Sequence, residues 1–204
     1  QHVRIHSIME RQVDHLVRLV DDLMEVSRIT RGNVSLQLEP VALATVVESA
    51  VEAARPEIDA GRHRLSIDLP ESPLVLRADR VRVAQILANL LNNAARHTPP
   101  GTPIHVDVTT TSAGVQLVVE DEGPGVPDDL KPSIFEPFRQ GENARGGVGI
   151  GLSLVGRFAE LHGGAARIED RDGGGARFVV DLPGDRSPEP TPLDEPTVTV
   201  DLAV

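Results

Sequence analysis

The chain has 204 residues, of which 40% are hydrophobic and 25% charged, proportions typical of a folded protein with a substantial core. Its formal net charge of −11 disfavours a nucleic-acid partner, which would need a basic face. The lack of cysteine excludes disulfides and thiolate chemistry, and no run of about 18 apolar residues predicts a membrane span, so no membrane contact is expected from this segment.

Residues 1–33 predict one long amphipathic helix. Its apolar positions recur in alternating steps of three and four residues, which is the spacing of a coiled-coil or bundle seam. Arg4, Arg11 and Arg18 repeat every seven residues on the polar side, and Gly32 followed by Asn33 would end the helix. A surface helix packed on its own domain is the alternative, but the long apolar stripe favours a bundle.

Residues 37–183 predict a domain in which helices alternate with short strands. Their order implies an α+β fold, namely a two-layer α/β sandwich with helices over one face of a mixed sheet. Residues 184–204 are acidic and rich in proline, and they predict a linker or tail. Helices are expected over 43–60, 79–97 and 151–162, with Asp79 as the N-cap of the second, and strands near 65–69, 74–76, 104–108, 115–119, 167–168 and 178–180.

The predicted helix over 79–97 carries two asparagines on one flank. At 100° per residue, Asn89 and Asn93 lie about 40° apart, and Arg96 follows on the next turn. Amide oxygens can bind a hard cation such as Mg²⁺ that also takes phosphate oxygens, and a guanidinium can bind a phosphate directly. Two asparagines at this spacing are more often ordinary polar residues, but asparagine is a poor helix former and needs a reason here.

A carboxylate and two glycines follow the predicted strand near 115–119. Asp121 ends the alternating run, and Gly123 and Gly125 leave room for a ligand to approach the backbone closely. Taken alone, this pattern is more often a simple turn after a strand. It opens a glycine- and proline-rich stretch up to residue 151, and a loop of that length inside a compact domain is usually a lid or a binding loop.

Three alternating glycines stand immediately before the last predicted helix. Gly147, Gly149 and Gly151 would give phosphate oxygens access to backbone N–H groups and to a helix N-terminus. No Gly-Lys-Ser/Thr follows, so this is not a Walker loop. A mobile hinge is the alternative if these glycines are considered alone.

Taken together and in this order, the motifs resemble the ATP-binding domain of sensor histidine kinases over about residues 9–183. The resemblance implies the Bergerat ATP-binding fold and a site for ATP and Mg²⁺. The corresponding N, G1, F and G2 boxes are Asn89-Leu90-Leu91-Asn92-Asn93-Ala94, Asp121-Glu122-Gly123-Pro124-Gly125, Phe135-Glu136-Pro137-Phe138 and Gly147-Val148-Gly149-Ile150-Gly151-Leu152.

The resemblance also implies a role for each site residue. Asn93 would be the primary Mg²⁺ residue with Asn89 supporting it, and both would be catalytic. Asp121 would accept a hydrogen bond from the adenine amino group. The other residues implied to contact nucleotide are Arg96, His97, Gly123, Gly125, Val126, Gly147, Gly149, Gly151 and Leu152, with Gln140 and Arg145 as lid contacts and Phe135 and Phe138 as packing anchors of the lid.

Two departures from the family pattern concern the nucleotide pocket. Ala176 stands where serine or threonine is usual, so a hydroxyl hydrogen bond is lost. His97 replaces the more frequent tyrosine and can still stack on the base.

Asn89 stands where gyrase and MutL-type ATPases have a glutamate that activates water, and an amide cannot be a general base.

The family's phosphoacceptor motif, roughly His-Glu-x-x-x-Pro, does not occur in the chain. The helix over 1–33 instead resembles the second helix of the dimerising hairpin, so we expect a fragment that starts after the phosphoacceptor helix. The resemblance implies homodimerisation through that helix, a response regulator receiver domain as partner and a cytoplasmic location, with the intact protein free to be membrane-attached. The main alternative is a nucleotide-binding regulatory module without phosphotransfer. A gyrase-type ATPase and an anti-sigma serine kinase fit less well.

Overall fold

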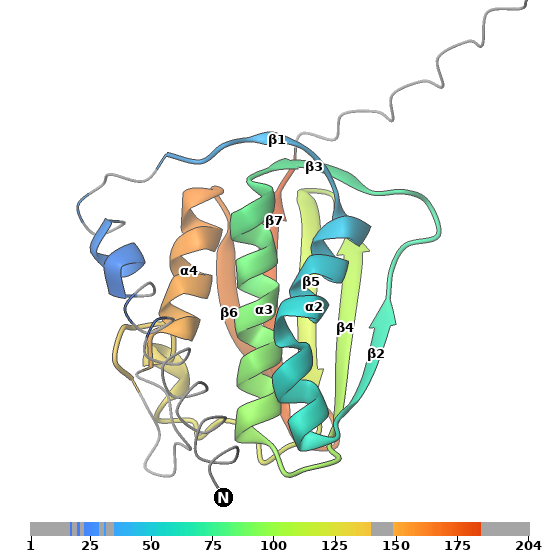
Figure 1. Ribbon diagram of the computed structural model, residues 1–204, viewed down its shortest axis with the longest axis vertical. Coiled ribbons are helices and arrows are strands. Elements are labelled where there is room, and N and C mark those ends of the chain that lie inside the picture. The colour runs from blue at the N-terminus through green and yellow to red at the C-terminus, as the bar shows by residue number, and fades with distance from the viewer. Residues whose placement is uncertain are drawn as a thin grey trace, which may run out of the picture.

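The computed structural model describes residues 35–139 and 149–184, together with 23–28, Val17, Val20 and Arg31. In these residues a layer of helices covers one face of a β-sheet (Figure 1). The elements in chain order are β1 (Glu39–Ala42), α2 (Leu43–Gly61), β2 (Arg64–Asp68), β3 (Val75–Ala78), α3 (Arg80–His97), β4 (Pro103–Thr110), β5 (Gly114–Asp121), the 3-10 turn η1 (Lys131–Ser133), α4 (Gly151–Leu161), β6 (Ala165–Asp170) and β7 (Ala176–Pro183).

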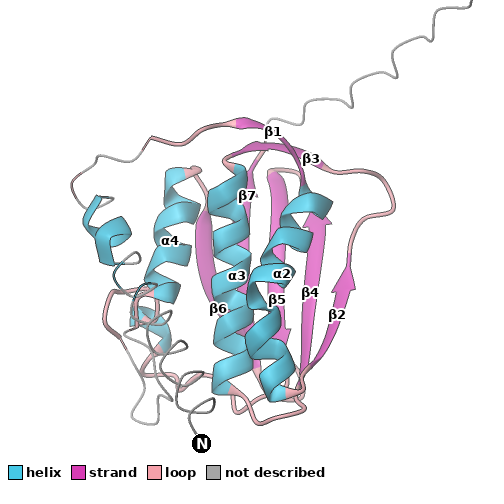
Figure 2. Ribbon diagram, in the orientation of Figure 1, coloured by secondary structure: helices cyan, strands magenta, loops and turns pink. Residues whose placement is uncertain are grey.

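The main sheet has five strands in the order β2-β4-β5-β7-β6. Strand β2 runs parallel to β4, and the other three pairings are antiparallel, so the sheet is mixed. Helices α4, α3 and α2 lie side by side over one face, with α3 in the middle (Figure 2). The predicted two-layer α/β sandwich is therefore confirmed, and the predicted helix limits agree to within one residue at the ends of α2, α3 and α4.

The core lies between the sheet and the three helices. Alternate residues of β4 (Ile104, Val106 and Val108) are almost completely buried, as the period of two in a strand requires. Helix α3 buries a stripe that includes Leu87, Leu90 and Leu91, which recurs at helical spacing. Aromatic side chains contribute little, since Phe158 and Phe178 are the only two among the fully buried large residues of the described chain.

Ion pairs cover much of the other face of the sheet. Arg177 on β7 pairs with Glu120 on β5 and, through Nε at 3.1 Å, with Glu169 on β6. Arg167 donates to the same Glu169 at 2.8 Å and also pairs with Asp181. Charged side chains that pair across the strands cover this face and can stay in contact with water. Helices are therefore needed only on the opposite, apolar face of the sheet.

The N-terminus of α3 is fixed by a predicted cap. The Oδ1 of Asp79 accepts hydrogen bonds from the backbone N–H groups of Val81 and Arg82, both at 3.1 Å. Its Oδ2 accepts from the N–H of Gln37 at 3.0 Å, and its own N–H donates to Nε2 of His162 at 3.1 Å. One residue thus joins the entering chain, the start of α3 and the end of α4.

One small sheet is absent from the predictions. Strand β1 pairs antiparallel with β3, and Val41 lies opposite Leu76. The four residues of β1 include Pro40 and show no apolar alternation, so nothing in that segment predicts a strand. Its only buried residue is Val41, which joins the main core.

The predicted long helix over 1–33 lies mostly outside the described residues. Residues 23–28 are helical, and Val26 packs against the core of the domain. The buried Glu25 pairs with Nη2 of Arg82 on α3 at 2.7 Å, and the Cζ of Arg82 lies 5.0 Å from the centre of the Phe158 ring on α4. Within the described part of the chain, no helix is both long enough and apolar enough to cross a membrane.

The buried ring of His63 joins the ends of α2, α3 and β4. Its Nδ1 lies 3.1 Å from the carbonyl oxygen of Thr102, and its Nε2 lies 3.0 Å from that of Ala95. We expect His63→Ala to lower the free energy of unfolding by about 2 kcal/mol, because it removes the hydrogen bond that the buried ring donates and leaves a small cavity. Urea denaturation will measure this change, with the more exposed His105→Ala as control at roughly 0.5 kcal/mol or less. A His63→Ala protein as stable as the wild type would contradict the prediction.

Candidate nucleotide-binding site

The residues predicted to bind nucleotide gather along the C-terminal half of α3. Asn89, Asn93 and His97 follow one another at intervals of one turn, so the set spans roughly 12 Å of helix. The N-terminus of α4 lies beside Asn89, and the end of β5 with Asp121 lies near the C-terminus of α3 (Figure 1). The structure therefore brings together residues that are up to about 60 positions apart in sequence.

Asp121 is buried at the end of β5, between the first residues of β4 and β7. It lies opposite Ile104 on one side and Ala176 on the other. Its Oδ1 accepts hydrogen bonds from the N–H groups of Gly123 at 2.9 Å and Ala176 at 3.4 Å. Among the described residues no group donates to Oδ2. That oxygen can therefore accept a hydrogen bond from a ligand.

The surroundings of Asp121 act on its charge in opposite directions. Burial raises the pKa of the Asp121 carboxyl, while the N–H groups of Gly123 and Ala176 and the charges of Arg171 and His97 lower it, and burial prevails. At the rim, partial burial and then the neighbouring Arg96 lower the pKa of His97, against the pull of Asp121. The imidazole of His97 is thus disposed to be neutral beside the carboxylate.

Glycine is required where the last hairpin meets Asp121. Gly175 has a φ of +106°, and a Cβ there would lie 1.8 Å from the carbonyl oxygen of Asp121. A Cβ on Gly125, whose φ is +74°, would lie 3.0 Å from the carbonyl oxygen of Gly175. The two glycine segments thus pass each other in direct contact, and Ala176 reaches Asp121 through its backbone although it lacks a side-chain hydroxyl.

At the other end of the site, Asn89 contacts the start of α4. Its Nδ2 donates to the carbonyl oxygen of Gly151 at 3.2 Å, and this hydrogen bond does not engage its Oδ1. Helix α4 has no side-chain cap, so the N–H groups of its first turn, at Gly151 and Leu152, have no protein acceptor from a capping residue. These groups and the positive end of the helix dipole can bind an anion.

The remaining predicted residues vary in how closely they approach this site. Asn93 is partly buried on the flank of α3, and Val126 and Leu152 pack against the core at its two sides. Arg96 is held away from it, because its Nη2 pairs with Oε1 of Glu57 on α2 at 2.7 Å. Gly147, and with it Gln140 and Arg145, lies outside the described residues.

The two ends of the predicted lid are joined. The N–H of Phe138 donates to the carbonyl oxygen of Gly149 at 3.0 Å, and both residues have a positive φ, 64° and 72°. Phe135 anchors this junction, since its ring packs edge-on against Phe178 at 6.4 Å and its Cβ lies close to Gly156. The expectation that Phe138 is a second packing anchor is wrong, because Phe138 is 59% exposed.

Some residues of the site carry no motif that could identify them in the sequence. Glu57 pairs with Arg96, 39 positions away, and Arg171 pairs with Glu122, 49 positions away. The buried Oδ1 of Asn92 has no partner in the described structure, next to the two predicted asparagines. A run of three asparagines within five positions was the only sequence signal for Asn92.

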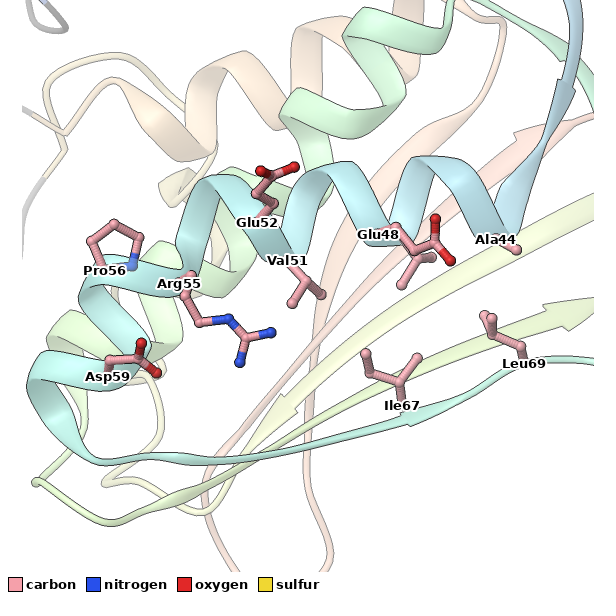
Figure 3. A pocket seen from close by; sticks show the side chains of 10 residues that line it. Ala44, Glu48, Val51, Glu52, Arg55, Pro56, Asp59, Ile67 and Leu69 are labelled. Carbon is pink, nitrogen blue, oxygen red and sulfur yellow. The ribbon is translucent and has the colours of Figure 1, made fainter.

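A groove of about 750 Å³ elsewhere on the domain is unsuited to a nucleotide. It lies between α2 and β2, where Ile67 and Leu69 face Val51 across the opening (Figure 3). The acidic side chains Glu48, Glu52 and Asp59 line it against a single cation, Arg55. A triphosphate would meet net repulsion there, so the site along α3 is the better place for an anionic ligand.

Comparison with known proteins agrees with this geometry. Residues 78–186, just over half of the chain, match the model of the family described as histidine kinase-, DNA gyrase B- and HSP90-like ATPases. The alginate biosynthesis sensor protein KinB of Pseudomonas aeruginosa is 34% identical over 86% of this chain and 29% of its own length. The chain thus spans less than a third of that curated relative.

Two solved structures share the fold closely. The crystal structure of full-length ShkA in complex with AMPPNP has a TM-score of 0.78 at 28% identity, covering 89% of this chain and 38% of that one. The Acinetobacter baumannii histidine kinase AdeS has a TM-score of 0.72 at 27% identity, covering 91% and 86%. The chain therefore belongs to the histidine kinase-, DNA gyrase B- and HSP90-like ATPase family, with an ATP-binding domain of the sensor histidine kinase type.

Proposed function

We propose that this chain is the ATP-binding catalytic part of a two-component sensor histidine kinase. ATP would lie along the C-terminal half of α3, with its base at Asp121 and its phosphates at the N-terminus of α4. The observation that carries this proposal is a pair of hydrogen-bonding groups without partners among the described residues, one near the C-terminal end of α3 and one beside its middle. They are the Oδ2 acceptor of Asp121 and the uncapped N–H donors of α4.

Base recognition would rest on Asp121. Its Oδ1 is engaged by two backbone N–H groups, which fixes the plane of the carboxylate. The remaining Oδ2 is an acceptor in a largely buried place, and the exocyclic amino group of adenine is a matching donor. The neutral ring of His97 at the rim offers a flat surface beside the base.

The residues near the phosphate end fit Mg²⁺. Asn89 gives its Nδ2 to Gly151 and keeps its Oδ1 as an acceptor, Asn93 lies one turn further on the same flank, and the buried Oδ1 of Asn92 has no protein donor. Oxygen ligands of this kind, shared with phosphate oxygens and water, are what Mg²⁺ prefers, and the bound ion would offset the phosphate charge.

Transfer of the γ-phosphate would be favoured over hydrolysis. The amide of Asn89 cannot take a proton from water, so no general base stands at this position. What the chain would contribute is orientation of the triphosphate by Asn89, Asn93 and the first turn of α4. The acceptor would be a histidine supplied by another segment of the full-length kinase or of its partner protomer, and an aspartate of a response regulator receiver domain would take the phosphoryl group from it.

We further propose that the intact kinase is a homodimer held by the N-terminal helix and acts in the cytoplasm, where ATP and the regulator are available. In support, one side of this helix contacts the domain through Glu25 and Val26. Four apolar residues remain about half exposed on it, namely Val17, Val20, Leu23 and Met24. Such a row needs a covering partner, and a second copy of the same helix would provide one.

Calorimetric titration with a non-hydrolysable ATP analogue, with and without Mg²⁺, tests this function directly. Magnesium-dependent binding, followed by transfer from ATP to a supplied phosphoacceptor helix, is the expected result. Binding without transfer would favour the regulatory module that binds nucleotide only. Absence of binding would overturn the proposal.

We expect Asp121→Asn to weaken ATP binding by about 10- to 100-fold, because the amide presents a donor to the adenine amino group. The fold should survive. Since the folded-state pKa of Asp121 is raised, its ionised form opposes folding at neutral pH, so the free energy of unfolding should stay equal or increase in the variant. Calorimetry and urea denaturation measure the two effects, with the exposed Asp128→Asn as matched control. Unchanged ATP affinity in Asp121→Asn would contradict the base assignment.

ATP affinity should also fall as the pH is lowered from 7. Asp121 must be ionised to accept a hydrogen bond from adenine, and burial raises its pKa from the ordinary value, so binding weakens about tenfold per pH unit once the pH is below that pKa. The ratio of wild-type to Asp121→Asn affinities at each pH removes the titration of ATP itself. A ratio that stays constant between pH 7 and pH 4 would disprove this dependence.

Glu57→Gln is expected to strengthen ATP binding by about threefold or less. In the wild type the Arg96 guanidinium is held by Glu57, and this partly exposed ion pair must open before Arg96 can reach a phosphate. Calorimetry on the variant, with Glu52→Gln on the same helix as control, measures the difference. Weaker binding in Glu57→Gln would show instead that Arg96 acts from its position at Glu57.

A further inference from the structure

Arg171 occupies the turn between β6 and β7 and contacts the residues before and after Asp121 in the chain. Its Nη1 donates to the carbonyl oxygen of Gly174 at 3.1 Å. Its Nη2 donates to Oε1 of Glu122 at 2.9 Å, and its Nε lies 3.5 Å from Oε2 of Glu120. Glu120 and Glu122 are the chain neighbours of Asp121, and Gly174 lies two residues before Ala176.

The guanidinium therefore bridges two segments that are otherwise joined by the pairing of β5 with β7. One is the end of β5, where three consecutive acidic residues repel one another. The other is the glycine-rich turn over 173–175, in which all three residues have a positive φ. Glycine turns of this kind are conformationally permissive, so their position depends on contacts such as the one from Arg171.

The position of that turn decides how Asp121 is held. Gly175 passes against the carbonyl oxygen of Asp121 so closely that no Cβ would fit. The next residue, Ala176, donates to Oδ1 of Asp121 at 3.4 Å, which is near the upper limit for a hydrogen bond. A small outward movement of the turn would break this bond and leave Oδ1 held only by the N–H of Gly123.

We propose that Arg171 is a positioning residue for adenine selectivity: by fastening the turn over 173–175 to Glu120 and Glu122, it commits Oδ1 of Asp121 to the backbone and leaves Oδ2 for the adenine amino group. This inference rests on the proposed function of the site. Arg171 itself does not touch the base. The positive charge of Arg171 agrees with this positioning role, because it also lies near the buried carboxylate of Asp121.

The competing explanation is that Arg171 only forms surface ion pairs. Such pairs contribute little to stability and nothing to ligand choice. Arg167 is a suitable reference for that case, since it lies on neighbouring β6, also contacts two carboxylates (Glu169 and Asp181), and has no contact with the residues around Asp121. A selectivity effect confined to Arg171 separates the two explanations.

The test compares ATP with inosine triphosphate, which carries a carbonyl oxygen in place of the adenine amino group. Calorimetric Kd values for both nucleotides are measured on the wild type, Arg171→Met, Arg171→Lys and Arg167→Met, and circular dichroism checks that each variant is folded. We expect Arg171→Met to raise the Kd for ATP about five- to tenfold and to leave that for inosine triphosphate within about twofold, so that selectivity is lost. Arg167→Met should keep the wild-type ratio.

Two further variants make the result decisive. Arg171→Lys keeps the charge but not the forked geometry, so it should also lose most of the selectivity. In an Asp121→Asn background, Arg171→Met should have no additional effect, because the two residues act through one carboxylate. Full selectivity in Arg171→Met or in Arg171→Lys would overturn the inference while ATP binding by the wild type upheld the proposed function. A wild-type chain that binds neither nucleotide would overturn both.

Discussion

The position of α3 is the constraint on which the rest of the domain depends. One side of this helix supplies the central stripe of the core, and the neighbouring flank carries the asparagines of the candidate nucleotide site. A rotation of the helix by even part of a turn would move both sets of residues together. Asp79 prevents this at the N-terminus through bonds to the helix, to the incoming chain and to α4, and His63 holds the carbonyl of Ala95 near the C-terminus. Each cap or buried bond of this kind contributes only about 1 kcal/mol, but together they fix one register.

The surroundings of Asp121 show a compromise between stability and binding. A buried acidic group is unfavourable for the fold, and an amide of the same shape would be tolerated more easily. The chain keeps the carboxylate and offsets part of the cost with two backbone N–H groups and a nearby arginine. The proposed recognition of a base would explain why a sequence retains such a residue, since the oxygen without a donor among the described residues is the one that a base would use.

How much could be predicted from the sequence depended on the distance between interacting residues. Asn89 and Asn93 share a flank because helical geometry is local, and Asp121 stands at the end of a strand whose alternation is visible in the sequence. The fold class followed from the same local patterns. Strand β1 was missed because Pro40 interrupts a four-residue segment that becomes extended only by pairing with β3. The pairs Arg96–Glu57 and Arg171–Glu122 depend on tertiary proximity, and each of these side chains alone resembles an ordinary surface charge. Phe138 was misjudged for a similar reason, because neither its positive φ nor its exposed side chain is indicated by the sequence around it.

The hydrogen bond between Phe138 and Gly149 has a consequence for how the length of the sequence between them can change. It holds two residues that are 11 positions apart in the sequence together, with 3.0 Å between the backbone nitrogen of Phe138 and the carbonyl oxygen of Gly149. The entropic penalty for closing a flexible loop between fixed points rises by only about 0.6 kcal/mol for each doubling of its length. A change in the number of residues between Phe138 and Gly149 is therefore expected to alter the stability of the rest of the domain only slightly. Phe138 and Gly149 themselves are more constrained, because each combines a positive φ with the bond that joins them.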